Sequence, residues 1–195
     1  MNLPNKLTLI RIFMIPVFVA LFYLSVIPFN FCIAAAVFAL AAFTDFLDGH
    51  IARKYNLVTD FGKFLDPIAD KVLVSTALII MLVPPMGANI LSAFVPPFVG
   101  AICVAIILAR ELIISGFRLV AANKGMVIAA DKSGKIKTFL TDIAIVVLLV
   151  SANLSGAGFK VINIIGLVLF YLSTALTVYS GIECMIKNKK VIASK

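Results

Sequence analysis

Six long apolar runs occupy most of this 195-residue chain, and they constrain its fold more than any other feature. A membrane-spanning helix needs about 20 mainly apolar residues, so six such runs and their short connections use nearly the whole length. The composition agrees, because 63% of the residues are hydrophobic and 13% are charged, whereas an ordinary soluble domain has about 25% charged residues. We expect the spans at about Ile12–Leu24, Phe31–Ala52, Phe61–Val83, Ile90–Ala109, Thr138–Ala152 and Val161–Met185.

The sequence therefore predicts an all-α integral membrane protein, a bundle of six transmembrane helices that forms one domain over residues 1–195. The segment Asn2–Arg11 comes before the first span and mixes Leu3, Leu7 and Ile10 with polar residues. This pattern is typical of an amphipathic segment that lies in the membrane interface. We expect such an interfacial segment at the N-terminus.

The basic residues predict how the bundle is oriented. With six spans, all of the 17 Lys and Arg residues except Lys160 fall on one side of the membrane. Cytoplasmic loops carry the excess of Lys and Arg, so we expect a multi-pass protein of the plasma membrane with both termini in the cytoplasm. A net charge of +8 can also indicate nucleic-acid binding, but this placement favours topology and anionic ligands, and we expect no nucleic-acid partner.

The acidic residues are concentrated between the second and third spans, where a window from Asp45 to Asp70 holds five of the nine. Asp45 and Asp48 are three residues apart, and Asp66 and Asp70 are four apart, so on helices each pair lies on one face at adjacent turns. If the two spans are antiparallel neighbours, the four carboxylates meet near one membrane face. Four like charges in a partly dry site need cations, and hard divalent ions prefer oxygen ligands.

The spacing D-x2-D-G-x2-A-R-x8-G-x3-D-x3-D resembles the signature of the CDP-alcohol phosphatidyltransferases. Its fixed positions here are Asp45, Asp48, Gly49, Ala52, Arg53, Gly62, Asp66 and Asp70. The resemblance implies two divalent cations, Mg²⁺ or Mn²⁺, held by the four aspartates, with Asp70 also acting as the general base. It further implies that the nucleotide of the donor is bound on the side formed by Asp48, Gly49, Ala52, Arg53 and Gly62.

The N-terminal residues Asn5, Thr8 and Arg11 resemble the N-x2-T-x2-R start of the bacterial phosphatidylglycerophosphate synthase branch of this family. Two interpretations are open at this point. Asn5 and Thr8 lie near the nucleotide pocket, or the segment is only a capped interfacial helix.

A second polar connection, residues 110–137, supplies candidates for binding an anionic acceptor. Arg110, Arg118 and Lys135 can converge on a phosphate such as that of glycerol 3-phosphate, or they only set topology and touch lipid head groups. The second role is favoured for Lys124, Lys132 and Lys137. The pair Arg110–Glu111 lies inside an apolar run, where charges are unfavourable near lipid unless they serve a site.

Together, the motif and the resemblance predict an enzyme that transfers the phosphatidyl group from CDP-diacylglycerol to glycerol 3-phosphate and releases CMP. Its other expected partners are membrane lipids and, by resemblance, a second copy of the chain in a homodimer. Serine, inositol phosphate or phosphatidylglycerol is the alternative acceptor. Two further alternatives are a divalent-cation transporter, which would place acids near mid-bilayer, and a non-catalytic bundle that binds anionic lipid.

Overall fold

The computed structural model describes residues 3–54, 60–85, 88, 90–123 and 132–188, and the side chains at 3–5, 45–54, 60–67, 123 and 132 lie outside this description. The described residues contain no β-strand, so the prediction of an all-helical chain is confirmed. In the part of the chain that the structure describes, six α-helices follow one another: α1 Leu3–Tyr23, α2 Asn30–Lys54, α3 Asp60–Ile80, α4 Pro97–Asn123, α5 Lys132–Ser151 and α6 Gly156–Lys187.

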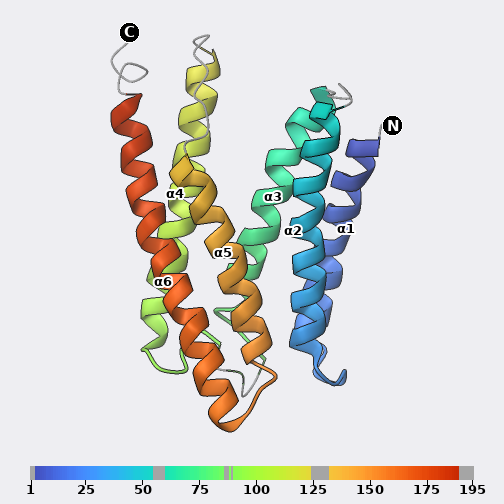
Figure 1. Cartoon of the computed structure of the whole chain (residues 1–195), viewed down its shortest axis with the longest axis vertical. Helices are drawn as coiled ribbons and strands as arrows, with labels where there is room; N and C mark the ends of the chain where they lie inside the picture. Colours follow the sequence, from blue (N-terminus) through green and yellow to red (C-terminus); the bar gives the residue numbers. More distant parts are fainter. Residues whose placement is uncertain (1–2, 55–59, 86–87, 89, 124–131, 189–195) are drawn as a thin grey trace.

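Consecutive helices run in opposite directions, so both ends of the chain lie at the same end of the molecule (Figure 1). The helix α1 packs against α2 and α3, and α6 packs against α4 and α5. These two groups meet where α2 contacts α5 and where α3 contacts α4 and α5. The C-terminal ends of α2 and α4 and the N-terminal ends of α3 and α5 therefore lie at one end of the bundle (Figure 1).

Three of the described helices are long and apolar enough to cross a membrane. The apolar stretches are Lys6–Tyr23 in α1, Pro97–Ala122 in α4 and the whole of α6. The apolar part of α2, Asn30–Thr44, is shorter than these. The apolar stretches of α1, α4 and α6 match or exceed the roughly 20 residues that a bilayer requires. The structure thus has the character of a membrane protein.

The N-terminal polar segment forms the first turns of α1, which is continuous from Leu3 to Tyr23. Two of its polar side chains, those of Thr8 and Arg11, are fully buried, whereas those of Lys6 and Ile10 are exposed. Arg11 Nε donates a hydrogen bond to the carbonyl oxygen of Ala41 in α2, at 3.2 Å. Arg11 is thus held against α2, and the position of the segment in the membrane interface stays a prediction.

The fourth helix begins at Pro97, inside the predicted span that starts at about Ile90, and the irregular start that the sequence predicts from its Pro96-Pro97 pair is confirmed. Proline disfavours a helical conformation at the residue before it and is well accommodated in the first helical turn, so the Pro96-Pro97 pair fixes this boundary. Ile90 is nevertheless buried, and its carbonyl accepts a hydrogen bond from Asn163 Nδ2 at 3.0 Å. This contact satisfies a non-helical backbone group inside the apolar end of the bundle.

The polar connection between the fourth and fifth spans is largely helical. The helix α4 continues through Arg110 and Glu111 to Asn123, and α5 begins at Lys132, six residues before the predicted span. Hydropathy places a boundary where charged residues begin, whereas a helix can extend beyond the hydrocarbon. Lys135 and Lys137 therefore lie on a helix with defined faces.

Candidate active site

The aspartates of the motif lie on two helices that contact each other. Asp45 and Asp48 belong to α2, and Asp66 and Asp70 belong to α3. Because both helices are continuous at these positions, the spacings of three and four residues place each pair at adjacent turns of one helix face. The side chains of Asp45, Asp48 and Asp66 lie outside the described residues, as do those of Gly49, Ala52, Arg53 and Gly62.

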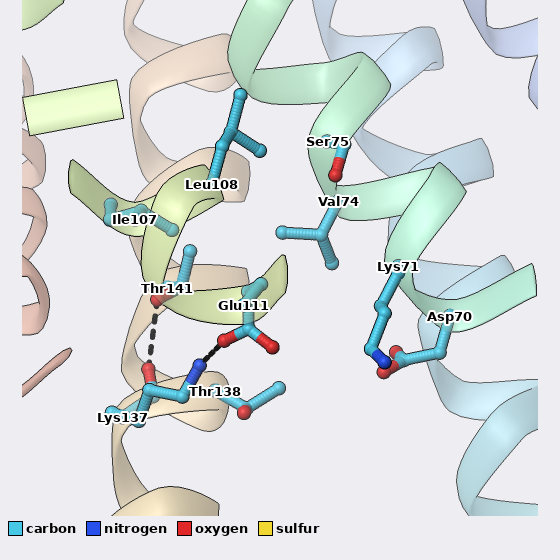
Figure 2. Close-up of a pocket in the computed structure, with 10 residues that line it drawn as sticks. All are labelled: Asp70, Lys71, Val74, Ser75, Ile107, Leu108, Glu111, Lys137, Thr138 and Thr141. Atoms are coloured by element: carbon cyan, nitrogen blue, oxygen red, sulfur yellow. Dashed lines mark hydrogen bonds and ion pairs between the residues drawn. The ribbon is translucent and has the colours of Figure 1, made fainter. Parts of the chain in front are cut away.

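Asp70 is described, and it opens onto a pocket between α3, α4 and α5 (Figure 2). Two lysines and two acids line this pocket together with apolar and hydroxyl side chains. The complete lining is Asp70, Lys71, Val74, Ser75, Ile107, Leu108, Glu111, Lys137, Thr138 and Thr141. Among the described side chains, no group of three His, Cys, Asp or Glu residues forms a metal site.

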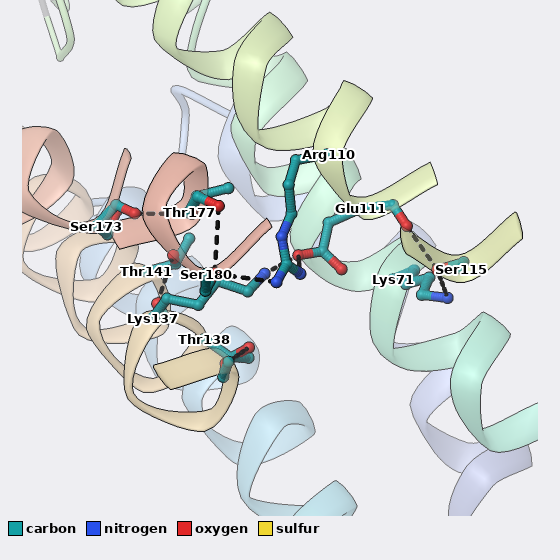
Figure 3. A network of polar contacts seen from close by, with 11 residues as sticks. Lys71, Arg110, Glu111, Ser115, Lys137, Thr138, Thr141, Ser173, Thr177 and Ser180 are labelled. Atoms are coloured by element: carbon teal, nitrogen blue, oxygen red, sulfur yellow. Dashed lines mark hydrogen bonds and ion pairs between the residues drawn. The ribbon is translucent and has the colours of Figure 1, made fainter. Parts of the chain in front are cut away.

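Glu111 connects two cations from different helices. Its Oε1 forms an ion pair with Lys137 Nζ of α5 and lies 3.5 Å from Arg110 Nη1 of α4. Figure 3 shows these three side chains pointing towards one another between the helices. A buried charge is stable when an opposite charge and hydrogen bonds compensate it, and Glu111 provides that compensation here.

The side chain of Arg110 is held in place by contacts with α6. Its Nη2 donates to Ser180 Oγ at 2.9 Å, and Ser180 in turn donates to the carbonyl of Thr177 at 3.2 Å. Gly181 makes room for the guanidinium stem, since a Cβ there would lie 3.1 Å from Arg110 Cγ. The absence of a side chain at Gly181 thus lets Arg110 lie flat against α6.

Lys71 connects α3 to the same part of α4. Its Nζ hydrogen-bonds to Ser115 Oγ, and Ser115 Oγ donates to the backbone carbonyl of Glu111 at 2.5 Å. Lys71 directly follows Asp70 in the chain, so this contact ties the turn of α3 that carries Asp70 to the turn of α4 that carries Glu111.

Lys137 is the most deeply buried cation of the pocket, with 6% of its side chain exposed. Burial lowers the pKa of its ammonium group to about 8; Arg110 also lowers this pKa, while Asp70 and Asp142 raise it. An anionic ligand beside Lys137 would favour the charged form and raise the pKa again. The pocket thus contains a lysine that an anion would stabilise.

The remaining predicted site residues lie at different depths. Thr8 is buried on α1, whereas the side chain of Asn5 lies outside the described residues. Arg118 on α4 and Lys135 on α5 are both exposed. Of the three predicted acceptor residues, Arg110 alone is part of the described network around Glu111.

Two cations of the pocket were not predicted as site residues. The sequence favours a topological role for Lys137 and gives no role to Lys71, although a charged residue within an apolar helix is a signal of a site. Arg110 and Glu111 carry this signal, and both lie in the polar network (Figure 3). Lys71 at the edge of the apolar run of α3 carries the same signal.

The fold and the pocket define an all-helical membrane protein with a charged, hydroxyl-lined site between the middle parts of α3 and α4 and the first part of α5. Carboxylates, ammonium groups and hydroxyl groups at such a site suit a polar, phosphorylated ligand. A family model described as CDP-alcohol phosphatidyltransferase matches residues 1–179. The chain belongs to this family, and the resemblance noted in its sequence is confirmed.

Curated relatives from distant organisms are similar over nearly the whole chain. A protein of Rickettsia typhi is 39% identical, over 92% of this chain and 93% of its own length. A protein of Bacillus subtilis is 40% identical, over 96% and 95% respectively, and one of Arabidopsis thaliana is 37% identical, over 100% and 82%. The first two are named CDP-diacylglycerol–glycerol-3-phosphate 3-phosphatidyltransferase, and the third bears the same name with the number 2.

Proposed function

We propose that this protein transfers the phosphatidyl group from CDP-diacylglycerol to glycerol 3-phosphate, releases CMP and forms phosphatidylglycerophosphate. The observation that carries the proposal is the similarity to relatives with this named activity over more than nine-tenths of the chain. The pocket agrees with it, because Asp70, Lys71 and Lys137 bring a base and two cations to one place. The enzyme is thus a phosphotransferase of phospholipid biosynthesis.

We propose Asp45, Asp48, Asp66 and Asp70 as the ligands of two divalent cations, Mg²⁺ or Mn²⁺. The donor set fits, because it is made of hard carboxylate oxygens on two helices that contact each other. When bound, such cations would neutralise the negative charge of a pyrophosphate.

Asp70 is the proposed general base. It accepts the proton of the acceptor hydroxyl, whose oxygen then forms a bond to the phosphorus that carries the lipid, while the bond from this phosphorus to the CMP oxygen breaks. An aspartate is ionised near neutral pH, so it is ready to accept that proton. Its position on the pocket wall gives the acceptor access to it.

The proposed donor side combines α1, α2 and the beginning of α3. Arg53 pairs with a phosphate of the donor, and small residues beside the aspartates leave space for the nucleotide. The proposed donor residues are Asn5, Thr8, Asp48, Gly49, Ala52, Arg53 and Gly62.

The proposed acceptor side lies across the pocket on α4 and α5. Arg110, Arg118 and Lys135 are proposed to bind the phosphate of glycerol 3-phosphate, and we add Lys137 because it lines the pocket beside Glu111. A phosphate bound there would lie across the pocket from Asp70 on α3 (Figure 2).

We further propose a plasma-membrane enzyme with six spans, both termini and the pocket on the cytoplasmic side, that works as a homodimer. The alternating helix directions support the common side of the termini (Figure 1). The soluble acceptor would reach the pocket from that side, while the acyl chains of the donor remain in the bilayer.

The test is CMP release by the purified protein in detergent micelles with CDP-diacylglycerol and glycerol 3-phosphate. We expect release to require both substrates, to stop on chelation, and to return with Mg²⁺ or Mn²⁺. Asp70→Asn should lower kcat at least about 100-fold, the usual scale for loss of a general base, while CDP-diacylglycerol still binds.

Three outcomes would change the proposal. Absence of CMP release with glycerol 3-phosphate, serine, inositol phosphate and phosphatidylglycerol would remove the transferase function. Release with only one of the other acceptors would replace the acceptor. An Asp70→Asn variant with wild-type kcat would remove Asp70 as the base.

A further inference from the structure

Glu111 is the acidic residue of the pocket for which the motif has no role. It is not one of the eight fixed positions, yet it lines the pocket and pairs with Lys137 and Arg110. These two cations are residues that we propose for binding the acceptor phosphate. A carboxylate that already pairs with both of them needs an explanation.

Exposure shows how the three groups are layered. The side chains of Lys137 and Arg110 are 6% and 13% exposed, and that of Glu111 is 26% exposed. The carboxylate is thus the most accessible of the three, and Figure 2 shows it together with Lys137 on the same side of the pocket. Glu111 is therefore accessible to a ligand that binds in the pocket beside Lys137.

The charges explain why a carboxylate is present. Two cations this close and this buried repel each other and lose hydration, so they need a counter-charge. A phosphate monoester carries up to two negative charges and three acceptor oxygens. It can therefore replace one carboxylate as the partner of Lys137 and Arg110 and compensate more of their charge.

We propose that Glu111 is an internal substitute for the acceptor phosphate: its carboxylate holds Lys137 and Arg110 before the acceptor binds and is displaced from them by the phosphate monoester of the acceptor. This inference rests on the proposed function, since it names what one residue does at the same site. Ser180 and Gly181 keep Arg110 against α6, so the guanidinium stays in place when Glu111 turns away. Glu111 is a positioning residue that also competes with the substrate.

A competing carboxylate weakens the binding of the ligand that it imitates. Glu111→Gln keeps the size of the side chain but removes its charge, and it leaves Lys137 and Arg110 without their counter-ion. We expect this variant to bind glycerol 3-phosphate roughly five- to tenfold more tightly than the wild-type protein, the scale of one lost charge pair in a partly exposed site. A residue that only supported the fold would give unchanged or weaker binding.

The measurement is the Kd of glycerol 3-phosphate by equilibrium dialysis, with the full chain in detergent micelles, Mg²⁺ in the buffer and no CDP-diacylglycerol. Inorganic phosphate should show the same tightening, glycerol should show no binding, and micelles containing phosphatidylglycerol should not compete. Competition by phosphatidylglycerol would assign the pocket to a lipid head group and overturn the inference. Equal or higher Kd values for Glu111→Gln would also overturn it.

The chain offers a matched control in Glu183. This glutamate of α6 also pairs with a lysine and a hydroxyl, since Lys187 Nζ lies 2.6 Å from its Oε1 and Ser133 Oγ donates to its Oε2 at 2.7 Å, but it does not line the pocket. Glu183→Gln should leave the Kd of glycerol 3-phosphate unchanged. An equal tightening in Glu183→Gln would show a general effect of net charge and count against the inference.

A second variant covers the case in which Glu111→Gln does not fold. Glu111→Asp keeps the charge but withdraws the carboxylate by one methylene, and it should bind glycerol 3-phosphate more tightly than wild type by about twofold to threefold. Unchanged or weaker binding by Glu111→Asp would overturn the inference.

If the wild-type protein releases CMP normally while neither variant binds glycerol 3-phosphate more tightly, this inference alone fails. Absence of CMP release and of glycerol 3-phosphate binding would remove the proposed function as well.

Discussion

Lys135 and Lys137 lie two residues apart on α5, so their side chains leave the helix in nearly opposite directions. Lys137 points into the pocket and pairs with Glu111, whereas Lys135 is exposed. A cation that is already desolvated loses little further hydration when a phosphate binds, and its interaction with that phosphate is less screened by water. The two lysines should therefore contribute unequally to acceptor binding.

We expect Lys137→Gln to raise the KM for glycerol 3-phosphate at least about tenfold, which corresponds to about 1.4 kcal/mol. Lys135→Gln should raise it by less than about threefold, as is usual for an exposed ion pair. Steady-state CMP release at saturating CDP-diacylglycerol measures both constants. A larger effect at Lys135 than at Lys137 would contradict this assignment of the acceptor side.

The difference between these lysines shows what the sequence could not provide. The motif predicts the four aspartates as site residues because their spacing along two helices is fixed in the sequence. The acceptor side depends on which faces of α4 and α5 meet α3, and no local spacing records that. Hydropathy begins the fifth span at Thr138, so it leaves Lys137 in the polar connection and assigns it to no helix face.

At the scale of the elements, the tightest contact with a glycine among the described residues joins α5 and α6. A Cβ at Gly166 would lie 2.7 Å from Leu148 Cγ and 3.3 Å from the backbone nitrogen of Leu148. The side chain of Leu148 can shift, but the backbone of α5 cannot do so without moving the helix. Small residues at helix contacts allow such close approach in membrane proteins.

Gly166→Ala should therefore destabilise the fold by about 1–3 kcal/mol, as overpacking of a tight core does. Gly158→Ala is the matched control on the same helix, because a Cβ there meets nothing within 4 Å, and alanine is the better helix former. Thermal unfolding in detergent micelles compares the two variants. Equal unfolding temperatures would contradict the tight packing of α5 against α6 at Gly166.

Helix number and order could be predicted because apolar runs of this length have few other solutions in a membrane. Helix ends were less predictable, for physical reasons that differ from one element to another. The Pro96-Pro97 pair delays α4, while α5 begins within charged residues that a hydropathy boundary excludes. In the first turns of α1 the side chain of Arg11 is buried and donates to a carbonyl on α2, which the periodicity of α1 alone does not show.

At the scale of the whole molecule, the distribution of charge follows the direction of the helices. The C-terminal end of α2 and the N-terminal end of α3, which carry the first aspartates of the motif and the residues that follow them, lie at the same end as both termini (Figure 1). Lys160, in the first turns of α6, is the one basic residue predicted for the other side. The sequence alone predicts this asymmetry, because the positions of basic residues relative to the spans are known without any tertiary contact.

The two ends of α6 offer a test of this orientation. Lys160 and Lys187 are separated by 27 positions of a continuous helix, which spans roughly 40 Å, close to the thickness of a bilayer with its head groups. In a variant without native cysteines, Lys160→Cys should react with a membrane-impermeant maleimide added to intact cells, whereas Lys187→Cys should react only after the membrane is opened. Both side chains are exposed, so a difference in labelling reports the side of the membrane. Labelling of Lys187→Cys in intact cells, with Lys160→Cys protected, would invert the orientation and place the pocket away from a cytosolic acceptor.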